Sequence, residues 1–315
     1  MTLANALKGR VWLVTLAALI VLVIVNAYLQ SNLFTPRVLK SNLTVFLPLV
    51  LIAVGQTYVI LAGDIDLSVG AIVALVNVVT VTVIAGIGTE DAAAVLAGIL
   101  AGLATGVACG LFNGFLVAAL RLQPIVATFA TGILFSGIAL RVLPTAGLPV
   151  PAPYWRTYAG GLFALPVVLW IFIAVLIAVG ILGARPFLRH LTAVGGHRAA
   201  AFQTGLAVTR VRIGGYVLAA LFSAVASLCL TGETASGDPL MGGSLALGSV
   251  SAVVLGGTAL SGGSGSAFGS VLGALVIGMI GNVIFFAGLP FEYQTLVKGV
   301  ITLAALAGGV VIARR

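Results

Sequence analysis

The stretch GARPFLRHLTAVGGHRAAAFQTGLAVTRVR, residues 183–212, interrupts a chain that is otherwise almost continuously apolar. It carries five of the fifteen Lys and Arg residues, namely Arg185, Arg189, Arg198, Arg210 and Arg212. Apolar runs long enough to cross a bilayer flank it on both sides, and long basic loops of membrane proteins stay in the cytoplasm. Segment 184–212 is therefore predicted to be a cytoplasmic loop, which orients every other span.

The composition also points to a protein built inside a membrane. Hydrophobic residues make up 61% of the 315 residues and charged residues only 7%, against about 25% charged in soluble domains. The net charge of +8 comes from helix ends and loops, without the aromatic-interleaved basic patch of a nucleic-acid binder. Cys109 and Cys229 lie in apolar runs as packing residues and suggest no metal framework. We predict an all-α polytopic membrane bundle, a single transmembrane domain over residues 1–315.

Ten apolar runs come close to the roughly 20 residues that a bilayer core demands. The first is too long for the apolar core of a signal peptide and lacks a clear cleavage site, so it is interpreted as an uncleaved span. The predicted spans are 11–29, 44–62, 67–88, 92–119, 124–141, 163–183, 213–230, 245–260, 266–287 and 294–312. This topology puts both termini and most of the basic residues in the cytoplasm. Runs 44–62 and 245–260 are the weakest and are alternatively broken or re-entrant.

Glycine recurs at every fourth position through one predicted span, at Gly98, Gly102, Gly106, Gly110 and Gly114. Such a strip is smooth over about 24 Å at 1.5 Å per residue. Small residues at this spacing let helices approach closely in lipid. A second, less regular strip comprises Gly265, Gly269, Gly273 and Gly281. Both spans are therefore expected in the interior of the bundle.

Two carboxylates stand in apolar sequence, in Gly63-Asp64-Ile65-Asp66-Leu67-Ser68. An ionised group at the centre of a membrane helix costs about 2.5–3.5 kcal/mol on insertion scales. Asp66 or Ser68 is therefore expected to cap the next helix through its free amides, or the segment lines a translocation path. The alternative is that Asp64 and Asp66 are the coupling acids of a proton- or sodium-driven carrier.

A similar stretch recurs at residues 256–263, aligned with 63–70 at a constant offset. It shares Gly, Leu-Ser and the final Gly but lacks the acids, so it is held only as a weak internal repeat. Broken helices at corresponding places in two halves often surround the substrate path of a transporter. Its candidate path or gate residues are Gly257, Thr258 and Ser261.

Two outer loops carry the remaining polar signals. The first, between Arg141 and Tyr158, has four prolines followed by Tyr154, Trp155 and Arg156. It is either a rigid connector or a docking element, because a stiff segment loses little entropy on binding. The second, 231–243, carries Glu233 and Asp238.

Inside the basic loop, residues 199–205 form a helix-favouring run with glycine stops on both sides. Gly195-Gly196 precede it and Gly205 ends it, in the left-handed conformation typical of helix ends. A short rigid helix of this kind can press on a cytoplasmic partner.

Four stretches together resemble the inner-membrane permease subunits of ribose-, xylose- and arabinose-type importers of the ATP-binding-cassette (ABC) class. They are LAGDIDLSVGAIVAL at 61–75, LQPIVATFATG at 122–132, AVGGHRAAAFQTGL at 193–206 and VVLGGTALSGGSGS at 253–266. The chain departs from that family at His197 and Arg198, where an Asn and an acidic residue are usual.

The resemblance implies a dimer of permease subunits in the bacterial inner membrane, a cytoplasmic ATPase and an extracytoplasmic sugar-binding protein. The chain would hold no cofactor, because ATP and Mg²⁺ belong to the ATPase. Its 193–206 loop would dock in a groove of that ATPase. The coupling residues would be Gly195, Gly196, His197, Arg198, Ala199, Ala200, Ala201 and Gly205.

The residues exclude nucleotide hydrolysis by the chain itself. A phosphate-binding loop needs glycines before Gly-Lys-Ser or Gly-Lys-Thr, and no glycine precedes the Lys40-Ser41 pair. A membrane-embedded hydrolase is disfavoured because no activated-nucleophile or His-Glu-x-x-His motif is present. The sequence therefore favours a permease that draws its energy from a partner, with the ion-driven carrier as the main rival.

Overall fold

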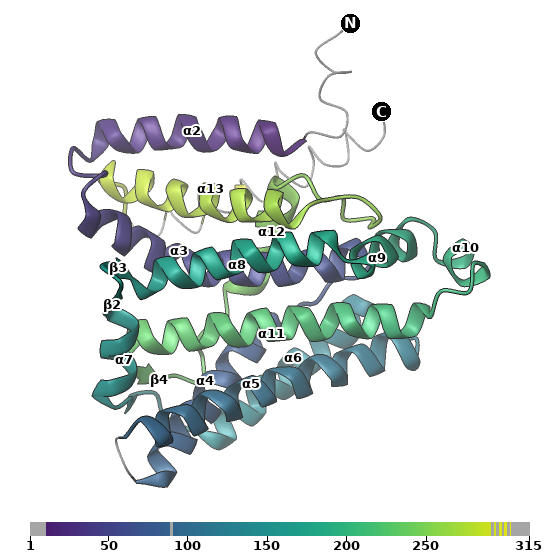
Figure 1. Ribbon diagram of the computed structural model, residues 1–315, viewed down its shortest axis with the longest axis horizontal. Coiled ribbons are helices and arrows are strands. Elements are labelled where there is room, and N and C mark those ends of the chain that lie inside the picture. Colours follow the sequence, from purple (N-terminus) through teal and green to yellow (C-terminus); the bar gives the residue numbers. More distant parts are fainter. Residues whose placement is uncertain are drawn as a thin grey trace, which may run out of the picture.

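The computed structural model describes residues 11–88, 91–290, 293, 296–297, 299–300 and 303. Long helices lie side by side along the longest axis of the molecule (Figure 1). Their bounds are α2 Val11–Leu29, α3 Pro36–Leu61, α4 Val69–Ile87, α5 Ala92–Gly114, α6 Pro124–Val142, α8 Val167–Ala184, α11 Val208–Thr234 and α13 Ala267–Phe286. The shorter helices are α7 Ala152–Ala159, α9 Pro186–Gly196, α10 Arg198–Gln203 and α12 Leu245–Leu255, and a π-helical turn, Phe115–Ala119, extends α5.

Eight of these helices are long and apolar enough to cross a membrane, which confirms a polytopic helical bundle. The predicted run 44–62 belongs to α3, whose 26 residues exceed what a bilayer requires. A full span at 245–260 is wrong, because α12 has 11 residues and reaches only about 16 Å at 1.5 Å per residue; its length fits the broken or re-entrant alternative for this run. The predicted span 294–312 lies almost entirely outside the described residues.

The core lies around α3 and α11. In the most apolar window of α3, 78% of residues are buried, against 11% in α2 and α8. Among the described residues, many outward side chains of the peripheral helices are large and apolar, for example Ile24, Phe129 and Ile177, as expected of a surface that faces lipid. Helix α11 packs against both α3 and α5, and α13 packs against α2, α3 and α12.

The glycine strip of α5 is confirmed as a packing surface. A Cβ on Gly98 would lie 2.7 Å from the Thr80 carbonyl of α4, and one on Gly106 would lie 2.6 Å from Ala224 of α11. The strip therefore serves two neighbours, first α4 and then α11. In the second strip, a Cβ on Gly273 would meet the backbone of α12 and one on Gly269 would meet Gly256 just after it. A Cβ on Gly265 would meet the Thr258 side chain, and one on Gly281 would meet nothing within 4 Å.

The two ends of the bundle differ. One end carries α9 and α10, and the other carries α7 and the short strands (Figure 1). Strand β1, Leu148–Pro149, pairs antiparallel with β4, Ser236–Gly237, and β2, Gly161–Leu162, pairs with β3, Leu165–Pro166. The β1–β4 pair joins the two segments that the sequence predicts as outer loops.

Candidate functional site: a glycine junction clamped by an ion-pair cluster

The candidate site begins where α3 ends, at a glycine in the left-handed conformation. Gly63 has a φ of 80°, which residues with a side chain rarely adopt. Its amide donates to the carbonyl of Ile60 at 2.9 Å, and the amide of Asp64 donates to that of Val59 at 3.2 Å. This pair of bonds closes a helix end and directs the Asp64 side chain away from α3.

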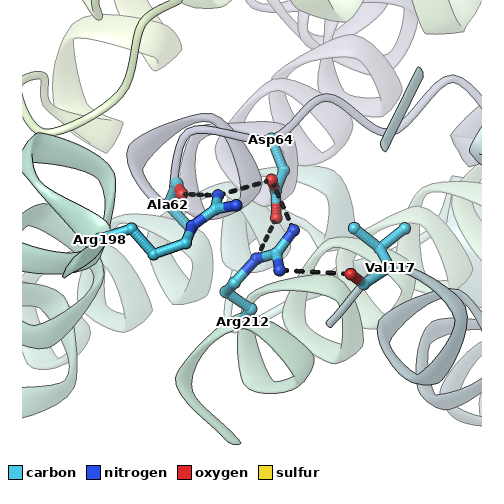
Figure 2. Close-up of polar contacts among 5 residues, drawn as sticks. All are labelled: Ala62, Asp64, Val117, Arg198 and Arg212. Atoms are coloured by element: carbon cyan, nitrogen blue, oxygen red, sulfur yellow. Dashed lines mark hydrogen bonds and ion pairs between the residues drawn. The ribbon is translucent and has the colours of Figure 1, made fainter. Parts of the chain in front are cut away.

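The Asp64 carboxylate accepts from two arginines (Figure 2). Arg212 of α11 donates from Nε to Oδ2 at 2.8 Å and from Nη2 to Oδ1 at 2.9 Å. Its Nη1 donates to the Val117 carbonyl in the π-helical turn at 3.2 Å. Arg198, the first residue of α10, donates from Nη2 to Asp64 Oδ1 at 3.2 Å and to the Ala62 carbonyl at 3.4 Å.

The two arginines hold Asp64 in different ways. Arg212 makes two hydrogen bonds to Asp64 and its side chain is 6% exposed, whereas Arg198 makes one hydrogen bond to Asp64 and is 48% exposed. A buried ion pair is strongly destabilised when one partner is removed, since the other charge stays behind without compensation. An exposed pair contributes little. Arg212 is therefore the structural partner of Asp64, and Arg198 is a contact that can open.

Asp66 belongs to a separate cluster in which its hydrogen-bond donors are uncharged. Its Oδ1 accepts from the amide and the hydroxyl of Ser68 at 2.8 and 2.6 Å, and Asn113 of α5 donates to Oδ2 at 3.4 Å and to the Ser68 hydroxyl at 2.7 Å. Burial raises the pKa of the Asp66 carboxyl, and these hydrogen bonds oppose that rise. The expected capping is wrong, because neither Asp66 nor Ser68 bonds a first-turn amide of α4. Asp66 shapes the turn before the helix instead.

Five glycines bring three chain segments into backbone contact beside Asp64. The amide of Gly263 donates to the last carbonyl of α3 at 3.0 Å. A Cβ on Gly262 would lie 2.7 Å from the Cα of Gly63, and one on Gly263 would lie 2.6 Å from the Cα of Gly196. A Cβ on Gly195 would collide with the last carbonyl of α3. We call Gly63, Gly195, Gly196, Gly262 and Gly263 the glycine junction; it ties the end of α9 to α3 and to the α12–α13 loop.

The predicted short helix is present as α10. His197 precedes it, and its Nδ1 accepts from the Ala200 amide at 3.2 Å. Gly205 follows it with a φ of 83°, which confirms the predicted left-handed end. Ala201 is buried, whereas Ala199, Ala200 and Phe202 are exposed, and Phe202 has 72% of its surface free. The predicted stop at Gly195-Gly196 is wrong, because both glycines lie in the last turn of α9 and the break before α10 is at His197, whose backbone is extended.

The second predicted break repeats the geometry of the first. Gly257 has a φ of 86°, its amide donates to Val254 at 2.9 Å, and the Thr258 amide donates to Val253 at 3.2 Å. Gly257 and Thr258 thus occupy the places of Gly63 and Asp64. The predicted alignment of residues 256–263 with 63–70 is therefore wrong by one residue, because it pairs Gly256 with Gly63. Ser261 is exposed and does not repeat the role of buried Ser68.

The predicted docking residues gather at the opposite end of the bundle. Arg156 lies over the Trp155 ring, 5.3 Å from its centroid. Tyr154 is buried and its hydroxyl donates to the Leu228 carbonyl of α11 at 2.9 Å, so it fastens α7 and does not face outward. Glu233 is exposed in the last turn of α11, and Asp238 Oδ1 accepts from the Leu240 amide at 2.8 Å.

Sequence reasoning missed the buried amides. Asn77, in the middle of α4, donates to the Thr231 hydroxyl at 2.7 Å and to the Ser236 carbonyl at 3.2 Å. Its Oδ1 accepts from the Asp238 amide at 2.7 Å, so it anchors the loop after α11. Asn77 and Asn113 are polar residues inside apolar spans, and that signal alone marks them as functional or structural.

Comparisons with known proteins agree with this arrangement. Residues 38–306 match the family described as "Branched-chain amino acid transport system / permease component". The ribose import permease protein RbsC of Bacillus subtilis (strain 168) is 39% identical over 292 residues, covering 91% of this chain and 89% of that protein. RbsC of Escherichia coli (strain K12) is 33% identical and covers 94% of both chains.

The L-arabinose transport system permease protein AraH of Escherichia coli (strain K12) is 34% identical over 259 residues, covering 81% of this chain and 77% of that protein. No solved structure matches the chain. The matched family consists of transport permeases and not of enzymes, and its extent leaves out only the first part of this chain and its last residues. This multi-pass membrane protein therefore belongs to the permease family that includes the ribose and arabinose importer permeases.

Proposed function

We propose that the chain is the transmembrane permease subunit of an ABC importer that moves a monosaccharide, a pentose, hexose or related polyol, into the cell. Ribose and arabinose are the first candidates, because relatives that cover most of the chain are ribose and L-arabinose permeases. Hydrolysis of ATP on a separate cytoplasmic ATPase drives transport, and an extracytoplasmic binding protein delivers the sugar. The observation that carries the proposal is the backbone contact between α9 and the end of α3 at the glycine junction.

Helix α10 is the proposed contact with the ATPase. It is short, it exposes Phe202, and a glycine in the left-handed conformation ends it. Displacement of α10 would move Arg198, which contacts Asp64, and the glycine junction would pass that movement to α3 and to the α12–α13 loop. A rigid helix transmits such a displacement, whereas a flexible loop of the same length would absorb it.

The candidate gate comprises the two breaks, Gly63 to Ser68 and Gly257 to Thr258. The first follows the long helix α3 and the second follows the short helix α12, both within apolar sequence, and broken helices of this kind often surround the substrate path of a transporter. Asp64 already has two cationic partners and Asp66 has three donors. This pairing favours a structural role over the proton coupling that the rival carrier hypothesis requires.

The opposite end of the bundle is the proposed docking face for the binding protein. Trp155 and Arg156 on α7, Glu233 in the last turn of α11 and Asp238 after β4 place one aromatic and three charged side chains at this end. A second permease subunit, identical or closely related, would complete the path. In the inner membrane, positive charge in segment 184–212 favours a cytoplasmic position for α9 and α10 and for both termini.

Reconstitution into liposomes tests the proposal. The chain is purified with the ATPase and binding protein encoded beside it. Uptake of labelled ribose, arabinose and xylose is then measured with and without ATP on the side of the membrane that carries the ATPase. We expect uptake of one sugar that needs both ATP and the binding protein. Uptake driven by an imposed proton gradient without ATP would refute the proposal in favour of the carrier.

A further inference from the structure

A cavity of about 370 Å³ opens at the α7 end of the bundle, away from the glycine junction. It lies between the first turns of α3, the end of α7, the start of α8 and the end of α11. Its charged lining residues are Arg37, Lys40 and Glu233, its hydroxyls come from Ser41 and Thr44, and its apolar wall includes Val45 and Val168. Val45 is 58% exposed within a spanning helix, so the cavity adjoins the apolar flank that faces lipid.

The two cations of the cavity stand where a helix least favours them. Arg37 and Lys40 occupy the first turns of α3, whose amino end carries the positive pole of the helix dipole, and that turn has no acidic residue. Lys40 Nζ donates to the Ala159 carbonyl, which leaves two of its three hydrogens available. Ion pairs in the described part of the chain are confined to Asp64. An oxyanion placed here would meet both cations and the helix dipole together.

Glu233 adds a negative charge to the same cavity, and it too has no ion-pair partner among the described residues. A simple anion satisfies Arg37 and Lys40 but is repelled by Glu233. A ligand that carries both a phosphate and an ammonium group satisfies all three. A quaternary ammonium has no hydrogen to donate to Glu233, and Arg156 already covers the Trp155 ring that could hold it by cation–π contact.

We propose that this cavity binds the headgroup of a membrane phospholipid with a primary ammonium, that is, phosphatidylethanolamine. Arg37 and Lys40 hold the phosphate, Glu233 accepts from the ammonium, and the acyl chains leave past Val45 along the apolar flank. Exposed Phe163 and Trp170 pack edge to face at the start of α8, at the same end of the bundle, and such aromatics suit the headgroup level of a bilayer. The lipid would hold α3, α7 and α11 together at this end.

Native mass spectrometry of the full chain tests this site. The protein is reconstituted in nanodiscs of equal phosphatidylethanolamine, phosphatidylglycerol and phosphatidylcholine, and the lipid that survives detergent exchange is counted. We expect the wild type to retain phosphatidylethanolamine. The double variant Arg37→Gln with Lys40→Gln is expected to retain about tenfold less, equivalent to about 1.4 kcal/mol. Arg141→Gln, an outer cation that does not line the cavity, is the matched control.

Glu233→Gln separates the two halves of the headgroup. This variant should keep phosphate binding and lose the preference for phosphatidylethanolamine over phosphatidylglycerol. Its result does not depend on whether the double variant folds. Equal retention of all three lipids by the wild type, or unchanged retention in both variants, would overturn the proposal. Displacement of the lipid by soluble glycerophosphoethanolamine alone would assign the cavity to a free phosphoester. Loss of binding-protein contact with unchanged lipid retention would assign it to the docking face.

Discussion

Removing the two arginines that hold Asp64 should separate folding from coupling. Arg212→Ala takes away a bidentate partner whose side chain is 6% exposed and leaves the buried Asp64 with only the partly exposed Arg198 as a cationic partner. Breaking a buried pair in this way costs about 3–5 kcal/mol. Arg198→Ala removes one 3.2 Å contact from a side chain that is 48% exposed, for which about 0.2–1 kcal/mol is typical. The difference between the two variants is therefore expected to be several-fold.

The assay pairs a stability measurement with a coupling measurement. Thermal unfolding in detergent should be lowered strongly by Arg212→Ala and hardly by Arg198→Ala. In assembled complexes, Arg198→Ala should nevertheless reduce the stimulation of ATP hydrolysis by loaded binding protein, because α10 would lose its contact with the end of α3. Arg189→Ala on α9, exposed and without an ion pair among the described residues, is the control. Equal destabilisation by both substitutions, or unchanged stimulation in Arg198→Ala, would refute the reasoning.

Four further outcomes are expected. Gly106→Leu should prevent assembly on a sizing column, since its Cβ would meet Ala224 of α11 at 2.6 Å, whereas Gly137→Leu, with open space around it, should assemble. Asp66→Asn should retain most uptake, because its amide oxygen can still accept from the Ser68 amide in the turn before α4. Gly205→Val should cost roughly 1–2 kcal/mol in strain and reduce stimulated ATP hydrolysis while the subunit stays in the membrane. A single cysteine at position 156 should be labelled by a membrane-impermeant reagent in intact cells. Labelling only after lysis would contradict the predicted topology and place this end of the bundle in the cytoplasm.

The sequence alone predicts the spans well because the bilayer sets their length. Seven of the predicted runs fall on helices with bounds that differ by a few residues, and the glycine spacing of α5 identifies its packing surface correctly. Both features depend on composition along one stretch of chain. For the same reason the sequence overestimates the length of α12, because the apolar run continues through Gly256 and Gly257, beyond the end of the helix at Leu255.

The ion-pair cluster could not be predicted, because its members are far apart along the chain. Asp64 and Arg212 are 148 residues apart, and only the packing of α3 against α11 brings them together. Arg212 was interpreted as one more positive charge of a cytoplasmic loop, although it lies in α11 and is buried. Charge counting orients a loop but cannot distinguish an exposed arginine from one that neutralises a buried acid.

The two helix breaks share a backbone but differ in charge, and their surroundings account for the difference. At the first break Asp64 faces Arg198 of α10, so a charge there links the proposed gate to the helix that we propose a partner displaces. At the second break Thr258 stands in its place, and its hydroxyl accepts from the amide of Ser266 at 3.2 Å, within its own loop. A buried charge is costly unless it is paired, so it is retained only at the break beside α10. The second break is expected to move together with the first through the glycine junction. There Gly262 contacts Gly63, next to Asp64, and Gly263 contacts Gly196, close to Arg198.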